Sequence, residues 1–386
     1  MGEIKVTVLG CGLIGGSMCL ALKRSHPEWT ITALDRSEQV PAMVEAGVAD
    51  LYGVFEEAEA HLPESSIVIL ATPVEVILEQ LEQIAPHLRE GTIVTDVGSA
   101  KSPIMERARD VLPDGVFFIG GHPIAGSEVS GVQAADPLVF KERVYVLCPF
   151  YDTPAEALLT LIEMAEDLLA WPVTIEPEEH DRVMAMVSHV PQLLSVALFK
   201  AAVDDDSGHG MLDLLAGRGF LGLTRLAASD FKVWNGILQT NLPSIRRAFD
   251  RLEKSLEAVR FEMDRGELAG MWKPLSQRRR EMGLERLPRM RLPEWRQLID
   301  RCDEEILRAL SHRIRVASRI GELKRHQDSP VSDPDRERRM MAKRHLWAKT
   351  LDVPTGLVDE LFDIIMKYSI RTQSNPGSDE ATRDDG

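Results

Sequence analysis

The sequence is poor in cysteine and in aromatic residues, and it lacks long apolar runs. Only 4 of its 386 residues are cysteine, at positions 11, 19, 148 and 302, and no C-x-x-C pair occurs. This pattern excludes a cysteine zinc site and a disulfide framework, and it indicates a reducing, cytoplasmic compartment. We find no run long enough to cross a bilayer and no signal peptide ahead of the first strand pattern. We therefore expect a cytoplasmic protein that does not contact a membrane.

Positive charge is also scarce, and it is unevenly distributed. The formal net charge is −16. Residues 1–290 carry all of this excess, because residues 291–376 are net +3 and the tail 377–386 is net −3. An acidic major part is unsuited to nucleic acid, so we expect no nucleic-acid partner. The length allows two or three domains.

Residues 1–177 alternate between short apolar runs and helical patterns. The runs lie at 4–9, 30–34, 66–71, 92–96, 116–119, 144–147 and 173–175. Such alternation predicts a parallel sheet with helices on both faces, which is the α/β Rossmann-like class. In these sheets ligands bind beyond the carboxyl ends of the strands, so the loops that follow the strands hold the candidate site.

A glycine-rich loop joins the first strand to the first helix. Its sequence Gly10-Cys11-Gly12-Leu13-Ile14-Gly15 has the spacing of dinucleotide-binding turns. Gly10 permits the tight turn, Gly12 lets a pyrophosphate approach the backbone, and Gly15 lets the helix pack on the strand. Asp35 ends the second strand and would accept hydrogen bonds from ribose hydroxyls, which favours NAD over NADP, although Arg36 could approach a 2′-phosphate. The alternative is a plain glycine turn with a solvent-facing aspartate.

Two later loops at the same sheet edge carry polar groups. One contains Ser99 and the other contains His122, between two glycines and a proline. A neutral imidazole beside a nicotinamide could accept the proton of a hydroxyl that is being oxidised, and Ser99 could hydrogen-bond the same hydroxyl. The alternative for His122 is a loop histidine that bonds backbone.

Residues 178–275 have a helical pattern, interrupted by Pro191 within 180–203. Arg225 stands among apolar residues, where it could form a fork for a substrate carboxylate or an ion pair with a nearby acid. Acidic residues at 204–206 lack the spacing of a calcium loop and indicate a solvated turn, so we expect no metal site.

These motifs resemble prephenate dehydrogenase. The glycine loop is followed in order by Asp-Val-Gly-Ser-x-Lys, Gly-Gly-His-Pro-x-Ala-Gly-Ser-Glu, His-Asp…Ser-His-x-Pro and Gly-Phe…Thr-Arg…Ser-Asp…Trp, over roughly residues 4–275. The resemblance implies oxidative decarboxylation of prephenate to 4-hydroxyphenylpyruvate, with NAD as hydride acceptor. It also implies that 1–177 is the NAD domain and that 178–275 is a helical dimerisation and substrate domain.

The resemblance assigns roles residue by residue. His122 matches the catalytic histidine and Ser99 the serine beside it, while Arg225 matches the arginine that holds a substrate carboxylate. Four further positions match residues that line the substrate pocket: Ser127, Glu128, His189 and Trp234. Of these, Trp234 matches an aromatic position of the pocket wall that is contributed within the helical dimer. Cofactor contacts fall on Gly10, Gly12, Leu13, Ile14, Gly15, Asp35 and Thr72. The sequence departs from the family at two places. Position 192 is glutamine where the family often has histidine, and residues 219–222 also differ. Both departures affect the expected discrimination between prephenate and its analogues.

The C-terminal part is helical throughout. Residues 276–290 are a linker whose basic run at 277–280 we interpret as a solvated helix end. One long helix is expected from 292 to about 327, a second from 334, and a third from 355 to about 373. Three such helices cannot bury their own apolar stripes well, which calls for a partner copy. The acidic tail 377–386 is expected to be disordered.

Residues 294–373 resemble the all-helical type of chorismate mutase, a three-helix domain that we place at 291–376. This implies rearrangement of chorismate to prephenate by folding the dianion and stabilising charge on the breaking ether oxygen. Arg296 from the partner chain, Arg313 and Arg336 would hold carboxylates and polar groups, and Lys324 and Gln373 would bond the ether oxygen. Glu337 would bond the ring hydroxyl, and two more positions match the pocket: Asp333 and Ser369.

The two resemblances together predict a bifunctional enzyme of tyrosine synthesis, because the product of the mutase is the substrate of the dehydrogenase. We expect a homodimer or a higher homo-oligomer. Three alternatives remain: a helical domain that only regulates or dimerises, a dehydrogenase for arogenate or 4-amino-4-deoxyprephenate, and an NAD sensor without turnover.

Overall fold

The computed structural model describes residues 4–125, 131–206, 210–282, 292–326, 334–351 and 353–374. The chain forms two compact units, Met1–Arg296 and Gln297–Gly386. Unit 1 combines the sheet with the helices that follow it.

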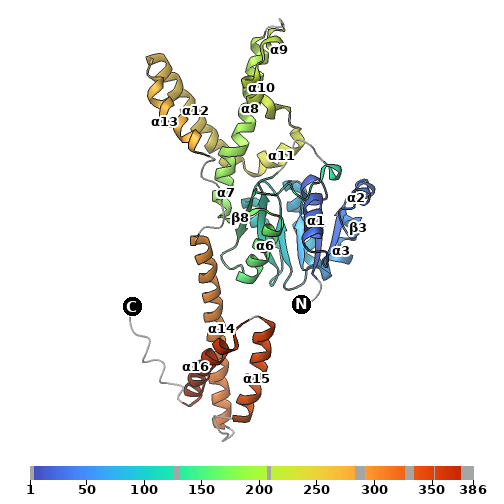
Figure 1. Ribbon diagram of the computed structural model, residues 1–386, viewed down its shortest axis with the longest axis vertical. Coiled ribbons are helices and arrows are strands. Elements are labelled where there is room, and N and C mark those ends of the chain that lie inside the picture. Colours follow the sequence, from blue (N-terminus) through green and yellow to red (C-terminus); the bar gives the residue numbers. More distant parts are fainter. Residues whose placement is uncertain are drawn as a thin grey trace. The chain divides into compact units, whose positions relative to one another are not determined.

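An eight-stranded sheet forms the centre of unit 1 (Figure 1). Its strand order is β3-β2-β1-β4-β5-β6-β7-β8, and β6 with β7 is an antiparallel pair in an otherwise parallel sheet. The strands are β1 Lys5–Leu9, β2 Thr30–Asp35, β3 Leu51–Val54, β4 Ile67–Leu70, β5 Ile93–Asp96, β6 Phe117–Pro123, β7 Val144–Pro149 and β8 Trp171–Thr174. The predicted Rossmann-like class is confirmed.

Two features of the sheet differ from the expectation. Strand β3 was not predicted. Its run Leu51-Tyr52-Gly53-Val54 is apolar but only four residues long and interrupted by a glycine, and Gly53 is its one buried residue. Strand β7 runs antiparallel to β6, although a wholly parallel sheet was expected. The described part of the β6–β7 connection contains only the short helix η4, Val132–Ala134, and a parallel return normally needs a longer helical crossover.

Helices cover both faces of the sheet. One face is packed by α4 Val74–Ile84 and α5 Ser102–Val111, which bury Ile77, Leu81 and Ile104 in one cluster with alternate residues of β4 and β5. On the other face lie α1 Leu13–Ser25 and α6 Ala155–Asp167, which contact each other (Figure 1). The two short helices of this half are α2 Val40–Ala46 and α3 Ala58–His61.

A helical arm continues from β8. A single continuous helix, Pro177–Asp205, consists of α7 Pro177–Met184, a π-helical turn Ala185–His189 and α8 Val190–Asp205. Pro191 does not break it, because the proline lies in the first turn of α8, directly after the π-helical turn. The arm continues with α9 Met211–Leu215, α10 Arg218–Thr224, α11 Phe231–Thr240, α12 Leu242–Arg265 and α13 Leu268–Glu281.

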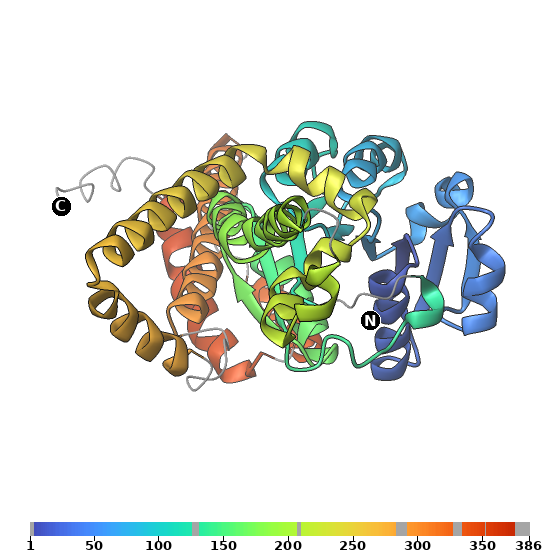
Figure 2. The ribbon, with the colours of Figure 1, turned by 90° about the horizontal axis from the view of Figure 1, so that it is seen from above.

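The turn between α12 and α13 is visible in Figure 2. Helix α13 extends to Glu281, so the helix enters the segment 276–290 that was predicted as a linker. Its last turn holds Arg278, Arg279 and Arg280, and all three are exposed. The basic run is therefore the solvated end of a helix.

The long helix Pro177–Asp205 contains an 18-residue window with a mean hydropathy of 1.4. By length and composition alone it could cross a membrane, which corrects the expectation that no run is long enough. Its polar residues nevertheless pack within unit 1. Gln192 Nε2 donates to Leu226 O at 2.9 Å, and Ser195 Oγ accepts from Ala227 N at 2.9 Å. These are the contacts of a helix packed against protein.

Unit 2 is made of three helices, as predicted. They are α14 Leu292–His326, which begins within unit 1, α15 Pro334–Thr350 and α16 Thr355–Ser374. Few apolar side chains of unit 2 are buried, among them Ala317, Ala348 and Val358. The predicted apolar stripe of α14 is only partly covered. Leu298 and Ala317 are buried, whereas Ile306 and Leu323 are 53% and 59% accessible.

Candidate active sites

His122 lies at the carboxyl end of β6, next to the equivalent end of β5. The preceding Gly121 permits this close approach, because a Cβ there would stand 2.3 Å from the carbonyl oxygen of Asp96. The His122 side chain is buried, with 7% of the residue accessible. A bulkier residue at Gly121 would therefore displace the candidate catalytic histidine.

A fully buried ion pair ties the two candidate loops together. The ammonium of Lys101 contacts the Asp96 carboxylate and donates to Gly121 O at 2.6 Å. Asp96 in turn accepts hydrogen bonds from Gly98 N at 2.8 Å and Gly121 N at 3.0 Å. Half-buried Ser99 lies between Gly98 and Lys101, so the loop with Ser99 and the strand with His122 share one anchor.

The imidazole of His122 is hydrogen-bonded to a second buried histidine. His122 Nδ1 lies 2.8 Å from His180 Nε2, and His180 Nδ1 lies 2.8 Å from Asp181 Oδ1. Burial above all, and then the neighbouring ionisable groups of His180, Lys101 and His189, hold the pKa of His122 well below its usual 6.5. His122 is therefore neutral at pH 7, in the form that can accept a proton.

His189 and Trp234 lie side by side. Their rings meet edge to face, with centroids 6.1 Å apart. Trp234 is carried by α11, which meets α4 closely at Gly236, where a Cβ would stand 1.7 Å from Glu75 Oε2. Burial lowers the pKa of His189 to about 4, so this ring is also neutral. Its Nδ1 lies 3.4 Å from Asn241 Nδ2, and its buried Nε2 has no hydrogen-bond partner in the described part of the chain.

Arg225 begins the short helix η6, Arg225–Ala228, and is exposed. The next residue, Leu226, offers its carbonyl to the Gln192 amide, three residues after His189. Arg225 is therefore joined through the backbone to the segment that carries His189. Gln192 Oε1 is buried without a partner among the described residues.

The glycine loop has the geometry of a dinucleotide cradle. Gly10 has a φ of +96°, and a Cβ there would meet Thr72 Cγ2 at 2.6 Å. A Cβ at Gly15 would stand 1.9 Å from Gly10 O, so the helix and strand require both glycines. Nothing lies within 4 Å of a Cβ on Gly12, where the loop is open to a ligand. Leu13 and Ile14 begin α1 directly after this opening.

The carboxylate of Asp35 stands at the end of β2 and faces this loop. It accepts hydrogen bonds from Cys11 N and Arg36 N, both at 2.7 Å. The Arg36 side chain is 64% accessible and lies 3.2 Å from Glu38. The charge next to the ribose position is thus a fixed carboxylate, which fits NAD and not a 2′-phosphate. Thr72 Oγ1 donates to Gln80 Oε1 at 2.7 Å, beside Gly10.

Ser127 and Glu128 lie outside the described residues. Among the residues that the structure does describe, no group of three or more His, Cys, Asp or Glu side chains could hold a metal.

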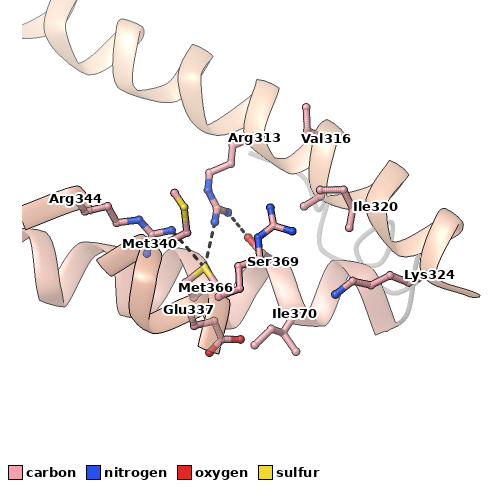
Figure 3. A pocket seen from close by; sticks show the side chains of 12 residues that line it. Arg313, Val316, Ile320, Lys324, Glu337, Met340, Arg344, Met366, Ser369 and Ile370 are labelled. Atoms are coloured by element: carbon pink, nitrogen blue, oxygen red, sulfur yellow. Dashed lines mark hydrogen bonds between the residues drawn. The ribbon is translucent and has the colours of Figure 1, made fainter. Parts of the chain in front are cut away.

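Unit 2 contains a separate pocket of about 270 Å³ among its three helices (Figure 3). Arg313 points into it from α14 and is bonded to the Ser369 hydroxyl of α16. Of the positions identified from sequence, the lining includes Arg313, Lys324, Arg336, Glu337 and Ser369. The remaining walls are mainly apolar: Val316, Ala317, Ile320, Met340, Met366 and Ile370. Cations in an apolar surround attract anions strongly.

Arg344 is a pocket residue that the sequence analysis missed. It comes from α15, is 8% accessible, and lies with its guanidinium 4.2 Å from the Phe362 ring centroid. It follows Glu337 by seven residues, close to two helical turns, so helical spacing could have identified it. Burial lowers its pKa, and burial with the charge of Arg344 lowers that of Arg313.

Three positions of the predicted mutase set are not among the described residues that line this pocket. Asp333 and the side chain of Gln373 lie outside the described residues. Arg296 is exposed near the start of α14 and belongs to unit 1, whereas the pocket is formed within unit 2.

Comparison with known families divides the chain in three. Residues 18–172 match the model described as prephenate dehydrogenase, nucleotide-binding domain. Residues 176–277 match prephenate dehydrogenase, dimerization domain, and residues 295–374 match chorismate mutase type II.

Individual proteins give the same picture for unit 1. The chain is 34% identical to a prephenate dehydrogenase of Bacillus subtilis over 280 residues, 71% of this chain and 74% of the relative. It superposes on a prephenate dehydrogenase of Aquifex aeolicus in complex with hydroxyphenyl propionate and NAD+, with 28% identity and a TM-score of 0.69 over 73% of this chain and 99% of that one. A Synechocystis arogenate dehydrogenase gives 28% identity and a TM-score of 0.64 over 72% and 100%.

Proposed function

The chain belongs to the prephenate dehydrogenase family and carries a chorismate mutase type II domain, and from that premise we propose how its two sites work. It is a bifunctional enzyme of tyrosine biosynthesis. Unit 2 rearranges chorismate to prephenate, and unit 1 oxidises and decarboxylates prephenate to 4-hydroxyphenylpyruvate with NAD.

In the oxidation, His122 acts as the general base. Bound NAD supplies the acceptor for the hydride that leaves the ring carbon bearing the hydroxyl. His122 takes the hydroxyl proton as that carbon gains carbonyl character. The bond to the ring carboxylate breaks, CO₂ leaves, and its electron pair makes the ring aromatic. His122 then returns the proton to the phenolate oxygen.

Other side chains of unit 1 hold the substrate. Ser99, anchored with His122 through Asp96 and Lys101, hydrogen-bonds the reacting hydroxyl. Arg225 forms a bidentate contact with a substrate carboxylate. His189 is neutral, and Asn241 Nδ2 donates to its Nδ1, so Nε2 carries the proton and donates to a substrate oxygen. Trp234 forms the wall behind it.

Cofactor contacts belong to the glycine loop and the end of β2. The N–H groups at the start of α1, after Gly12, bind the pyrophosphate. Asp35 accepts hydrogen bonds from the adenine ribose, and its charge repels a 2′-phosphate. We propose further contacts from Leu13, Ile14 and Thr72, which border the loop.

In the rearrangement, unit 2 acts by shape and charge and needs no nucleophile. One bond forms and one ether bond breaks within the same molecule. Arg313, Arg336 and Arg344 hold the two carboxylates and the polar groups next to them. Lys324 donates to the ether oxygen, where negative charge develops. Glu337 accepts from the ring hydroxyl, and Ser369 keeps Arg313 in place.

We propose a homodimer or higher homo-oligomer in the cytoplasm. The α8 helix exposes Val196, Phe199 and Val203, and the α14 helix exposes Ile306 and Leu323. Exposed apolar stripes on long helices are covered best by a second copy. The scarcity of cysteine and the lack of a C-x-x-C pair support the cytoplasmic part of this proposal.

One observation carries the proposal: one chain contains a neutral buried histidine at the same carboxyl edge of the sheet as a dinucleotide loop, and also a cationic pocket. Its test assays the two steps separately in two variants. We expect His122→Asn to lose oxidation by 10²-fold or more, an order set by general-base catalysis, and to keep mutase turnover. We expect Lys324→Ala to lose mutase turnover and to keep prephenate oxidation. Loss of both activities in either folded variant would contradict two independent sites.

Arogenate is a second candidate substrate, and one observation favours it. Gln192 stands where the family often has histidine, and its Oε1 is buried without a partner among the described residues. That oxygen could accept from the amino group that distinguishes arogenate. Comparison of kcat/KM on prephenate, arogenate and 4-amino-4-deoxyprephenate decides between them.

A further inference from the structure

Resting on the dehydrogenase function proposed above, we infer that His180 and Asp181 are positioning residues. They determine which nitrogen of His122 carries a proton, and so leave Nε2 as the base. The three side chains form one buried row, with 7%, 2% and 3% of His122, His180 and Asp181 accessible.

The placement of the protons in this row is determined first by Asp181. Its carboxylate accepts hydrogen bonds from Lys101 N at 2.7 Å and Ser102 N at 2.8 Å. Burial raises the pKa of Asp181, but the hydrogen bonds from His180, Lys101 and Ser102 outweigh burial and lower it. Asp181 is therefore ionised and can only accept. The Nδ1 of His180, 2.8 Å away, must be the donor.

The next step follows from His180. The inferred arrangement has His180 as the imidazole with one proton, on Nδ1, so that its Nε2 offers a lone pair. His122 Nδ1 lies 2.8 Å from this lone pair and must donate to it. The proton of neutral His122 is then on Nδ1, and its Nε2 is bare. Nε2 has no hydrogen-bond partner among the described residues, so it is available to a substrate.

Without this row, neutral His122 would distribute its proton between both nitrogens. Molecules with the proton on Nε2 could not take a proton from the substrate at that atom. The row therefore has a catalytic role, because it keeps Nε2 of His122 unprotonated. It also has a structural role, because Asp181 joins α7 to the start of α5. An experiment must separate the two roles.

Two substitutions of His180 make that separation. Gln at position 180 has a carbonyl oxygen that can accept from His122 Nδ1–H, whereas Phe fills similar space without an acceptor. We expect His180→Gln to stay within about twofold of wild-type kcat for prephenate oxidation. We expect His180→Phe to lose kcat in proportion to the share of molecules with the proton on Nε2, about tenfold, because a buried Nδ1–H without an acceptor is disfavoured, with little change in KM. Mutase turnover and Tm report the folding of both variants.

The tautomer itself can be read by ¹⁵N NMR of the histidine-labelled full-length protein, with His122 assigned from the spectrum of His122→Asn. In wild type, Nε2 should resonate as an unprotonated ring nitrogen and Nδ1 as a protonated one. In His180→Phe the two should become mixed, and His180→Gln should restore the wild-type pattern. A wild-type proton on Nε2, or equal kcat in folded Gln and Phe variants, would overturn the inference. Absence of prephenate oxidation in the wild type would instead refute the proposed function, and the NMR result would still stand.

Discussion

The guanidinium groups of Arg313 and Arg344 both lie against the sulfur of Met366, with Nη2 atoms at 3.2 and 3.7 Å (Figure 3). Neither has a carboxylate partner among the described residues. Two cations held together in an apolar pocket repel each other, and Arg344 lowers the pKa of Arg313 for that reason, after burial. A dianionic ligand would relieve this repulsion.

Replacing Arg344 should therefore weaken chorismate binding more than it weakens the fold. We expect Arg344→Met to raise KM about tenfold or more, the cost of one charged hydrogen bond, with a smaller effect on kcat. The free energy of unfolding should stay equal or rise, because an apolar group replaces an unpaired buried charge. Arg319→Met, at an exposed position of α14, is the matched control. An unchanged KM would remove Arg344 from the site.

The preference for NAD should depend on the charge of Asp35. Asp35→Asn keeps one acceptor for the amides of Cys11 and Arg36 but no longer repels a 2′-phosphate. We expect the ratio of kcat/KM for NAD over NADP to fall at least about tenfold, as for one charge contact. Glu45→Gln removes an equal charge from the exposed face of α2 and should leave the ratio unchanged. Equal ratios in both variants would refute the role of Asp35.

The pH profile of oxidation should reflect the depressed pKa of His122. Because burial and the neighbouring ionisable groups lower this pKa well below 6.5, the free enzyme keeps its base at pH 6. The acid limb of kcat/KM should therefore lie well below pH 6.5. Initial rates in overlapping buffers measure it. A midpoint at or above pH 6.5 would mean that His122 is solvated or is not the base.

Acid should destabilise unit 1 through His189. Its pKa is about 4 in the folded state against 6.5 in the unfolded chain. Between these values the unfolded chain binds more protons, so stability falls as pH falls, by about 3 kcal/mol in total. His122 acts in the same direction. Protonation of Asp181 lowers the free energy of unfolding only near and below its ordinary pKa of 3.8, which lies outside this pH window.

Urea unfolding at pH 7.5, 5.5 and 4.5 measures this loss. His189→Gln should flatten the pH dependence relative to wild type, whatever its stability at pH 7.5. Glu178→Gln changes an exposed residue of α7 and should retain the wild-type slope. A wild-type slope in His189→Gln would show that His189 is not buried neutral.

Much of the architecture could be predicted because short buried strands and glycine turns leave strong local patterns. The G-x-G-x-x-G loop, the strand edge with His122 and the three C-terminal helices are examples. Strand β3 left no such pattern, because it lies at the sheet edge and Leu51 is 46% accessible. The direction of β7 depends on how its connection crosses space, which local periodicity does not encode.

Contacts between distant residues were the part that the sequence could not supply. The motif His-Asp was visible, but only the fold brings His180 within 2.8 Å of His122. Pro191 predicted an interruption, and the π-helical turn before it absorbs the proline without one. Arg344 was overlooked because regularly spaced arginines on helices are usually solvated, and its burial depends on how α15 packs against α16.

The central claim is that one polypeptide carries out two consecutive reactions. A coupled assay tests it most directly: purified full-length protein receives chorismate and NAD alone, and the absorbance of reduced NAD is followed. The account predicts steady reduction of NAD without any added mutase. Reduction from prephenate but not from chorismate would contradict it, because the helical domain would then be a regulatory or dimerising module without turnover.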